Sequence, residues 1–201
     1  KPAPGRDDND HLPRTMHEQS PPTLRPPTVL ATDLDGTLIP LEGNERNLID
    51  LQHLKRQLAE RKVMLAFVTG RHLEIVEEAI DQYGLPLPDW IICDVGTSIY
   101  RREPGGWAGE SAYSEHLASI SNLLPIDELR SLLAEVAGLR LQEPAKQGVF
   151  KLSYYADHHA LEDVESRISA LLEKQGAPWS LISSVDPFTG EGLIDLLPRG
   201  V

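Results

Sequence analysis

The stretch that most constrains this chain is residues 29–38, VLATDLDGTL. Its short apolar run, bounded by Pro27 and Gly36, is typical of a buried parallel strand. Asp33 and Asp35 follow where the strand ends, and open α/β sheets bind ligands at the carboxyl ends of their strands. Gly36 lets the backbone turn sharply there. Two carboxylates with no basic partner nearby in sequence favour a magnesium ion and a phosphate over an ion pair.

The next segments repeat an alternation of strand and helix. Leucines at helical spacing predict an amphipathic helix over residues 45–61, and residues 63–68 form a second apolar run. A third run covers residues 90–94. Strand, helix and strand in succession predict a right-handed βαβ unit with parallel strands. The fold class is therefore expected to be α/β, with a parallel-sheet, Rossmann-like core.

Thr69 and Gly70 follow the second run as Asp33 and Asp35 follow the first, so parallel strands place all four at the same sheet edge. A helix is predicted over residues 72–83, directly after them. The Thr69 hydroxyl and the free backbone amides at this helix start predict an anion site. An ordinary role for Thr69 as a helix N-cap remains open.

The predicted chain has four parts. Residues 1–27 hold seven of the sixteen prolines and predict a flexible linker. Residues 28–102 form the core, a breaker cluster begins at residue 103, and residues 103–192 predict an inserted α+β cap. Residues 193–201 are expected to return toward the core. The elements expected beyond the core are helices over residues 114–122, 126–137 and 159–175 and strands over residues 149–155, 179–183 and 193–197.

Charge and composition exclude several classes of partner. A net charge of -12 disfavours nucleic acid and anionic membrane surfaces, and no run reaches the roughly 18 apolar residues of a membrane span. Cys93 is the only cysteine, so no internal disulfide can form and a cytoplasmic location is expected; the residue itself is expected to be a small buried hydrophobe. His158 and His159 lack a third ligand at metal-binding spacing and predict a solvated helix start.

The pattern Asp-x-Asp-Gly-Thr after an apolar strand resembles the first signature of the haloacid dehalogenase-like phosphatases. The Thr69-Gly70 pair resembles their second signature. Four later segments look, in order, like those of sucrose-phosphate phosphatases: residues 92–97 (ICDVGT), 113–117 (YSEHL), 150–155 (FKLSYY) and 194–198 (IDLLP). The resemblance covers residues 28–201 and implies a haloacid-dehalogenase core with an α+β cap inserted after the second signature.

The resemblance implies a mechanism for these residues. Asp33 would be the nucleophile that forms an aspartyl-phosphate, and Asp35 the general acid and base. The Asp33 carboxylate and the Asp35 carbonyl would hold Mg²⁺. Thr69, Gly70 and Gly36 are the phosphate-binding candidates. The implied reaction converts a small-molecule sugar phosphate, sucrose 6-phosphate, to sucrose and phosphate.

Three further residues are candidate substrate contacts. Lys151 matches the sugar-contacting lysine of the family, and Thr97 lies in the third-strand segment. Where the subfamily often has a glutamate after Gly-Thr, this chain has Ser98. Arg71, after Thr-Gly, could bind the phosphate or pair with an acid, and both readings stay open.

The family has a lysine and then a Gly-Asp-x-x-Asn-Asp segment after the cap, and neither follows residues 194–198 here. We therefore expect a phosphatase cut short after its cap, with an incomplete core. One alternative is a non-catalytic module fused to an upstream glycosyltransferase domain, as the tail of a sucrose-phosphate synthase. Another is a phosphatase for mannosylglycerate phosphate.

Overall fold

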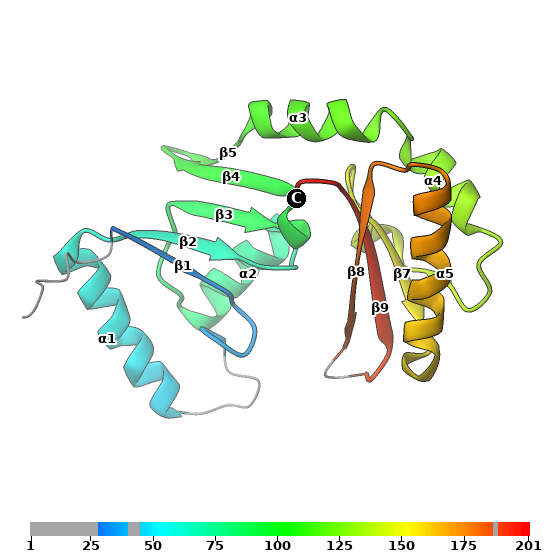
Figure 1. The fold of residues 1–201 in the computed structure, drawn as a ribbon. Helices are drawn as coiled ribbons and strands as arrows, with labels where there is room; N and C mark the ends of the chain where they lie inside the picture. The colour runs from blue at the N-terminus through cyan, green and yellow to red at the C-terminus, as the bar shows by residue number, and fades with distance from the viewer. Residues whose placement is uncertain (1–27, 40–44, 187–188) are drawn as a thin grey trace, which may run out of the picture.

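The structure, a computed structural model, describes residues 28–39, 45–186 and 189–201; the predicted linker lies outside the described residues. Two sheets lie side by side, and helix α3 (Ser111–Ser121) runs along one side of both (Figure 1). The first unit contains β1 (Val29–Thr32), α1 (Glu45–Arg61), β2 (Met64–Val68), α2 (Leu73–Tyr83), β3 (Trp90–Cys93), β4 (Ser98–Glu103) and β5 (Gly106–Gly109). The second contains α4 (Ile126–Leu133), β6 (Arg140–Leu141), β7 (Leu152–Ala156), α5 (Leu161–Lys174), β8 (Trp179–Val185) and β9 (Gly192–Pro198). The described residues also form three short 3₁₀ helices: η1 (Asp94–Gly96) between β3 and β4, η2 (Pro144–Lys146) between β6 and β7, and η3 (His158–Ala160) between β7 and α5.

The first sheet has the order β1-β2-β3-β4-β5. Strands β1, β2 and β3 are parallel, with Thr32 beside Phe67 and Phe67 beside Ile91. Strands β4 and β5 are antiparallel additions at one edge. The predicted parallel core of an α/β fold is therefore confirmed, and the carboxyl ends of β1, β2 and β3 meet at one sheet edge.

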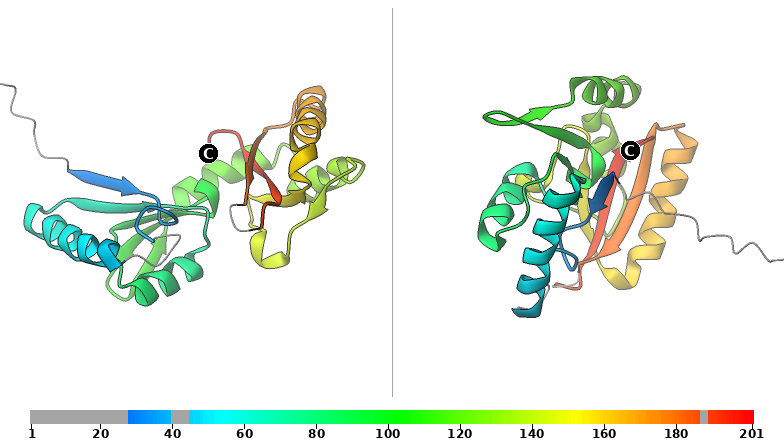
Figure 2. Two further views of the ribbon diagram at one scale, coloured as in Figure 1. Left: turned by 90° about the horizontal axis from the view of Figure 1, so that it is seen from below. Right: turned by 90° about the vertical axis from the view of Figure 1, so that its left-hand side faces the viewer.

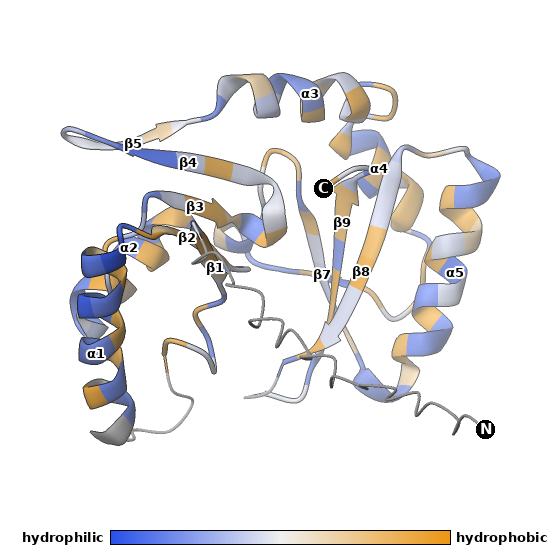
Figure 3. Cartoon of the chain, turned by 60° about the vertical axis from the view of Figure 1, so that its left-hand side comes forward, coloured by the Kyte–Doolittle hydropathy of each residue, from blue (hydrophilic) through white to orange (hydrophobic). Residues whose placement is uncertain are grey.

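Helices α1 and α2 both cover the same face of the first sheet. Phe67 and Ile91 of the sheet pack in one cluster with Leu51 of α1 and Val76 of α2. In Figure 3 both α1 and the later helix α5 carry hydrophobic and hydrophilic residues, as amphipathic helices on a sheet do. On the other face of the first sheet, the large apolar side chains of Val29 (49%), Met64 (43%) and Val68 (40%) are exposed.

The structure differs from the predicted core boundary at residue 103. Strands β4 and β5 pair from Glu103–Gly106 outward, so the Pro104-Gly105 pair is the turn of a hairpin that belongs to the first sheet. Both Gly105 and Gly106 have positive φ, which favours glycine at such a turn. The breaker cluster therefore marks a hairpin turn and not a change of unit.

The second sheet has the order β6-β7-β9-β8 and is antiparallel throughout. Its core lies between the sheet and α5, where Ile168 and Leu172 meet Trp179, Ile194 and Leu196. Most of the segment expected to return toward the core, residues 193–201, lies in β9, which pairs along its length with β7 and β8. The local sequence predicts a strand there, but it does not indicate that the neighbours of this strand are β7 and β8.

The two units meet at η1. The Tyr113 hydroxyl of α3 donates a hydrogen bond to the Gly96 carbonyl at 2.8 Å. The side chain of Val201 also packs against Gly96, since a Cβ added at residue 96 would lie 3.0 Å from the Val201 Cγ1. The left view of Figure 2 shows the two sheets apart, with α3 and the last residues between them. Of the described helices, none is both long and apolar enough to cross a membrane.

Candidate active site

Asp33 and Asp35 lie at the carboxyl end of β1, and both are exposed. Asp33 Oδ1 accepts a hydrogen bond from the Leu34 amide at 2.7 Å. Gly36 has φ of +72°, and its amide donates to the Ile39 carbonyl at 2.7 Å. The turn after β1 is thus closed by its own backbone hydrogen bond, and Gly36 supplies both the donor of that bond and the positive φ of the turn.

Arg71 makes the contact that the sequence left open. Its Nε donates to Asp35 Oδ2 at 2.8 Å, and its second guanidinium nitrogen donates to Asp35 Oδ1 at 2.6 Å. This bidentate pair connects the ends of β1 and β2, and the Asp35 hydrogen bond raises the pKa of Arg71 above its ordinary value. In this structure Arg71 therefore pairs with the acid, and a phosphate would have to compete for it.

Thr69 and Gly70 follow β2 at the same edge. Thr69 is 6% exposed, and its Oγ1 accepts from the Arg71 amide at 3.2 Å. The N-cap of α2 is His72, so Thr69 lies outside the cap position. Gly70 is exposed, and a Cβ there would make an ordinary contact of 3.8 Å with Val95. The loop of Thr69 to Arg71 is held in place without an N-cap role for Thr69.

Asp94 follows β3 and brings together residues that the sequence reasoning did not connect. Its Oδ1 contacts His72 Nδ1 and lies 3.6 Å from Lys151 Nζ, which comes from the second unit. The Lys151 side chain is 5% exposed and that of Asp94 is 14% exposed. Thr97 is also buried, and its hydroxyl donates to the Asp94 carbonyl at 2.9 Å. That bond holds the turn, so the Thr97 hydroxyl already has an intramolecular partner.

The sequence model of the sucrose-6F-phosphate phosphohydrolase family matches residues 26–201. The chain belongs to this family. The match spans both sheets, so the phosphatase resemblance noted in the opening signature extends through the cap. The predicted superfamily, haloacid dehalogenase-like, and the sucrose-phosphatase subfamily are confirmed.

Individual relatives agree with this family. A putative HAD-like hydrolase of Nitrosococcus oceani is 38% identical over 173 residues, which are 85% of this chain and 46% of that protein. A sucrose-phosphatase of Synechocystis sp. PCC6803, solved in complex with sucrose and phosphate, has a TM-score of 0.67 at 29% identity, covering 85% of this chain and 64% of that chain. A stretch of 71 residues is 44% identical to glucosylglycerol-phosphate synthase of Pseudomonas anguilliseptica, 35% of this chain and 9% of that protein. The chain thus spans less than half the length of the first relative and less than two thirds of the second.

Family phosphatases depend on a metal, and the residues after β1 fit a hard divalent cation. Oxygen ligands are what such cations take, and Asp33 offers an exposed carboxylate. The Asp35 carboxylate is held by Arg71, so its backbone carbonyl is the better candidate ligand. Within residues 28–39, 45–186 and 189–201, no third His, Cys, Asp or Glu joins this pair closely enough to share one ion.

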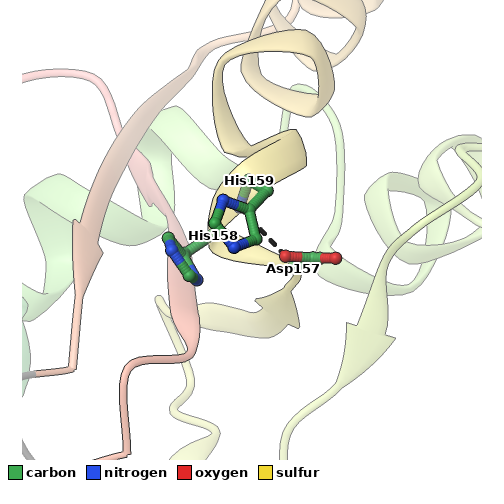
Figure 4. A group of neighbouring side chains, drawn as sticks. All are labelled: Asp157, His158 and His159. Carbon is green, nitrogen blue, oxygen red and sulfur yellow. Dashed lines mark hydrogen bonds between the residues drawn. The ribbon is translucent and has the colours of Figure 1, made fainter.

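A second cluster lies at η3, where Figure 4 shows Asp157, His158 and His159 together. Their potential ligand atoms lie within 4.8 Å of one another, so Asp157 is a third potential ligand that the sequence reasoning missed. All three residues are exposed, and Asp157 Oδ1 already accepts from the His159 amide at 2.9 Å. That bond caps the short helix, which agrees with the solvated helix start expected here.

Cys93 gives a first testable prediction. Burial, with the nearby Asp94 carboxylate second, raises the pKa of its thiol to about 12. The reactive thiolate is therefore scarce below that pH in the folded chain. We expect a thiol reagent at pH 8 to leave Cys93 unmodified until the chain is unfolded in urea. Rapid labelling of the native chain, measured by intact mass, would contradict this burial.

Proposed function

We propose that this chain carries the nucleophile and the cap of a magnesium-dependent phosphatase for sucrose 6-phosphate. The observation that carries the proposal is one juxtaposition. Asp33 and Asp35 after β1 lie at the same sheet edge as Thr69 after β2, in a chain matched by the sucrose-phosphatase family over both units. That edge is where open α/β sheets bind ligands.

In the proposed reaction an Asp33 carboxylate oxygen attacks phosphorus, and the bond from phosphorus to the sugar oxygen breaks. Asp35, in its protonated form, gives its proton to the departing sugar oxygen. Water then attacks the aspartyl-phosphate, and the Asp35 carboxylate takes the proton of that water. Inorganic phosphate leaves, and both aspartates return to their starting states.

Mg²⁺ is the metal we propose for this site. The Asp33 carboxylate and the Asp35 backbone carbonyl would be its protein ligands, and the ion would supply positive charge beside the phosphoryl oxygens. The Thr69 hydroxyl and the Gly70 amide would hold the phosphoryl group itself. Gly36 is a weaker candidate for that role, because its amide is already bonded to Ile39.

The Arg71 pair gives Asp35 a condition for acting as an acid. Both carboxylate oxygens of Asp35 accept hydrogen bonds from Arg71, so neither is free to approach the departing sugar oxygen. A dianionic phosphate on the loop of Thr69 to Arg71 would attract the same guanidinium. Arg71 would then leave Asp35 free to carry the proton for the leaving group.

The cap would recognise the sugar. Lys151 is the candidate contact, because it projects from the second unit to within 3.6 Å of Asp94 at the carboxyl edge of the first sheet. Thr97 is the less favoured candidate, since its hydroxyl is bonded to the Asp94 carbonyl. This arrangement would place the phosphate on the first unit and the sugar between the two units.

Phosphate release tests this proposal. The polypeptide, with any residues that its gene encodes beyond Val201, is incubated with sucrose 6-phosphate, glucose 6-phosphate or mannosylglycerate phosphate. With Mg²⁺ we expect release from sucrose 6-phosphate to be faster by about tenfold or more, a discrimination that a few matched hydroxyl contacts can supply. EDTA should abolish it. Equal release from all three, or release that survives EDTA, would refute the proposed substrate or the proposed metal respectively.

We also propose that a chain of this kind works beside the enzyme that makes its substrate. The identity to part of a glucosylglycerol-phosphate synthase supports fusion to an upstream glycosyltransferase domain. A fused domain would raise the local concentration of the sugar phosphate at the phosphatase. The coding sequence upstream of Lys1 decides the matter.

A further inference from the structure

Asp94 lies in an unusual backbone conformation directly after β3. Its φ is +54°, and that of the next residue, Val95, is +58°. Left-handed φ is uncommon for residues other than glycine, is least unfavourable for Asp and Asn, and is a genuine outlier for a β-branched residue. Strained positions of this kind persist only where surrounding contacts hold them, and they gather at functional sites. The turn of Asp94 and Val95 is therefore a strained position that its contacts must hold.

Backbone hydrogen bonds connect this turn both to the Arg71 loop of the first unit and to helix α3. The Asp94 amide donates to the Arg71 carbonyl at 2.9 Å, which fixes the turn to the loop proposed to bind phosphate. Two residues later, the Gly96 carbonyl accepts from Tyr113 of α3. The position of Asp94 is thus set by the first unit and by the helix that leads to the second.

The side chain of Asp94 points to the second unit. Its Oδ1 is buried and, among the described residues, accepts no well-aligned hydrogen bond. Its compensation is electrostatic: the Lys151 ammonium lies 3.6 Å away, and the His72 imidazole is in contact. Lys151 is itself 4% exposed, and a buried ammonium requires a charged or hydrogen-bonded partner. Each charge is therefore the reason the other can be buried.

The backbone of Lys151 is also held in place, by a turn of the second unit. Its amide and carbonyl both bond to Gly148, at 3.4 Å and 3.0 Å, and a Cβ at residue 148 would come within 3.3 Å of the Lys151 Cβ. The backbone of Lys151 is thus fixed by the second unit, and the end of its side chain by the first. The residue of the first unit that holds the end of the Lys151 side chain is Asp94.

We propose that Asp94 is a positioning residue that holds Lys151 at the carboxyl edge of the first sheet, where the phosphorylated sugar binds. The inference rests on the proposed function and adds to it a residue that has no role in the proposed reaction. Asp94 fixes the cap lysine relative to the phosphate loop, because one residue bonds Arg71 through its backbone and Lys151 through its side chain. Without the carboxylate, Lys151 would lose its buried partner and turn toward solvent.

The variant that tests this is Asp94→Asn. Asparagine tolerates the left-handed φ as aspartate does, so the substitution removes the charge and keeps the backbone. Asp89→Asn is the matched control, because Asp89 also pairs with a cationic side chain, that of Arg102, but lies at the opposite ends of the strands. Its carboxylate accepts a hydrogen bond from the Leu65 amide as well. The first readout is acetylation of Lys151 by acetic anhydride, followed by mass spectrometry and referred to the exposed Lys174.

We expect Lys151 in Asp94→Asn to be acetylated about tenfold faster than in the unchanged chain, because a buried charge without its partner does not stay buried. Asp89→Asn should leave the ratio of Lys151 to Lys174 labelling unchanged. An Asp94→Asn chain with unchanged Lys151 labelling would overturn the proposal. Faster labelling of both lysines would also overturn it, because that result reports general unfolding.

The second readout is the split between KM and kcat for sucrose 6-phosphate. We expect Asp94→Asn to raise KM about tenfold and to change kcat by less than about threefold, since Lys151 would contact the sugar and not the reacting phosphorus. Lys151→Met should have the same effect, and the double variant should add little to either. An unchanged KM in Asp94→Asn, or full additivity, would overturn the positioning role.

If the unchanged protein releases no phosphate, the proposed function fails, and protection replaces KM as the second readout. Sucrose 6-phosphate should then slow Lys151 acetylation in the unchanged chain and do so at about tenfold higher concentration in Asp94→Asn. Absence of protection would overturn the placement of Lys151 beside the sugar. The two failures are thus distinguishable.

Discussion

Asp33→Asn is expected to lower phosphate release by a factor of about 10³ or more, the scale of a lost nucleophile. The amide nitrogen of asparagine cannot attack phosphorus as a carboxylate oxygen does. The substitution also removes a negatively charged ligand from the proposed Mg²⁺ site. The substitution should leave the fold intact, because Asp33 is exposed and an asparagine Oδ1 can still accept from the Leu34 amide. The measurement is kcat for sucrose 6-phosphate with saturating Mg²⁺.

Asp81→Asn is the matched control for this loss. Asp81 is an exposed aspartate on α2, away from the strand ends, and its replacement should change kcat by less than about twofold, as surface substitutions usually do. If Asp33→Asn retained a tenth of the unchanged rate, another residue would be the nucleophile. Circular dichroism of the three chains separates lost chemistry from lost structure.

The parallel core could be predicted because its signals are local. Each of the first three strands is a short apolar run that ends in polar residues and glycine, and a helix with one apolar face lies between successive strands. Burial on the covered face follows from that pattern, as Phe67 and Ile91 show at 0% exposure. Because parallel strands align their ends, the same reasoning placed Asp33 and Thr69 at one edge.

The edge hairpin and the place of β9 could not be predicted in the same way. The Pro104-Gly105 turn has the composition of a domain boundary as much as that of a hairpin, and only the pairing of β4 with β5 distinguishes them. Strand β9 is locally an apolar strand whichever sheet it joins. Its partners, β7 and β8, are decided by contacts between distant residues, which a strand pattern does not contain.

The positions of the candidate site residues could be predicted where these residues adjoin strand ends, and not where the two units meet. Asp33, Asp35 and Thr69 follow apolar runs and could be found from position alone. The contact of Asp94 with His72 and Lys151 depends on a left-handed turn and on the approach of a second sheet. The one signal in the sequence was an aspartate directly before Val-Gly-Thr, at the end of a strand.

The separation of the two cores leads to a prediction about stability. The cluster around Phe67 and the cluster around Trp179 share no residue. Trp179 is 1% exposed, and its Nε1 donates to the Leu124 carbonyl at 2.9 Å. Trp179→Ala should therefore lower the free energy of unfolding of the second unit by about 3–5 kcal/mol, the usual cost of removing a buried aromatic side chain. The first unit should keep most of its own stability.

Hydrogen exchange measured unit by unit tests this. In Trp179→Ala we expect faster exchange at the amides of β7, β8 and β9, with the amides of β2 and β3 changed far less, because distinct cores open as distinct units. Trp179→Phe is the matched control: it keeps an aromatic ring but leaves the Leu124 carbonyl without its donor, a loss of about 1–3 kcal/mol. Equal acceleration in both sheets would mean that the contacts at η1 couple the two units into one cooperative structure. The backbone position of Lys151 would then depend on the folding of both units and not on the second sheet alone.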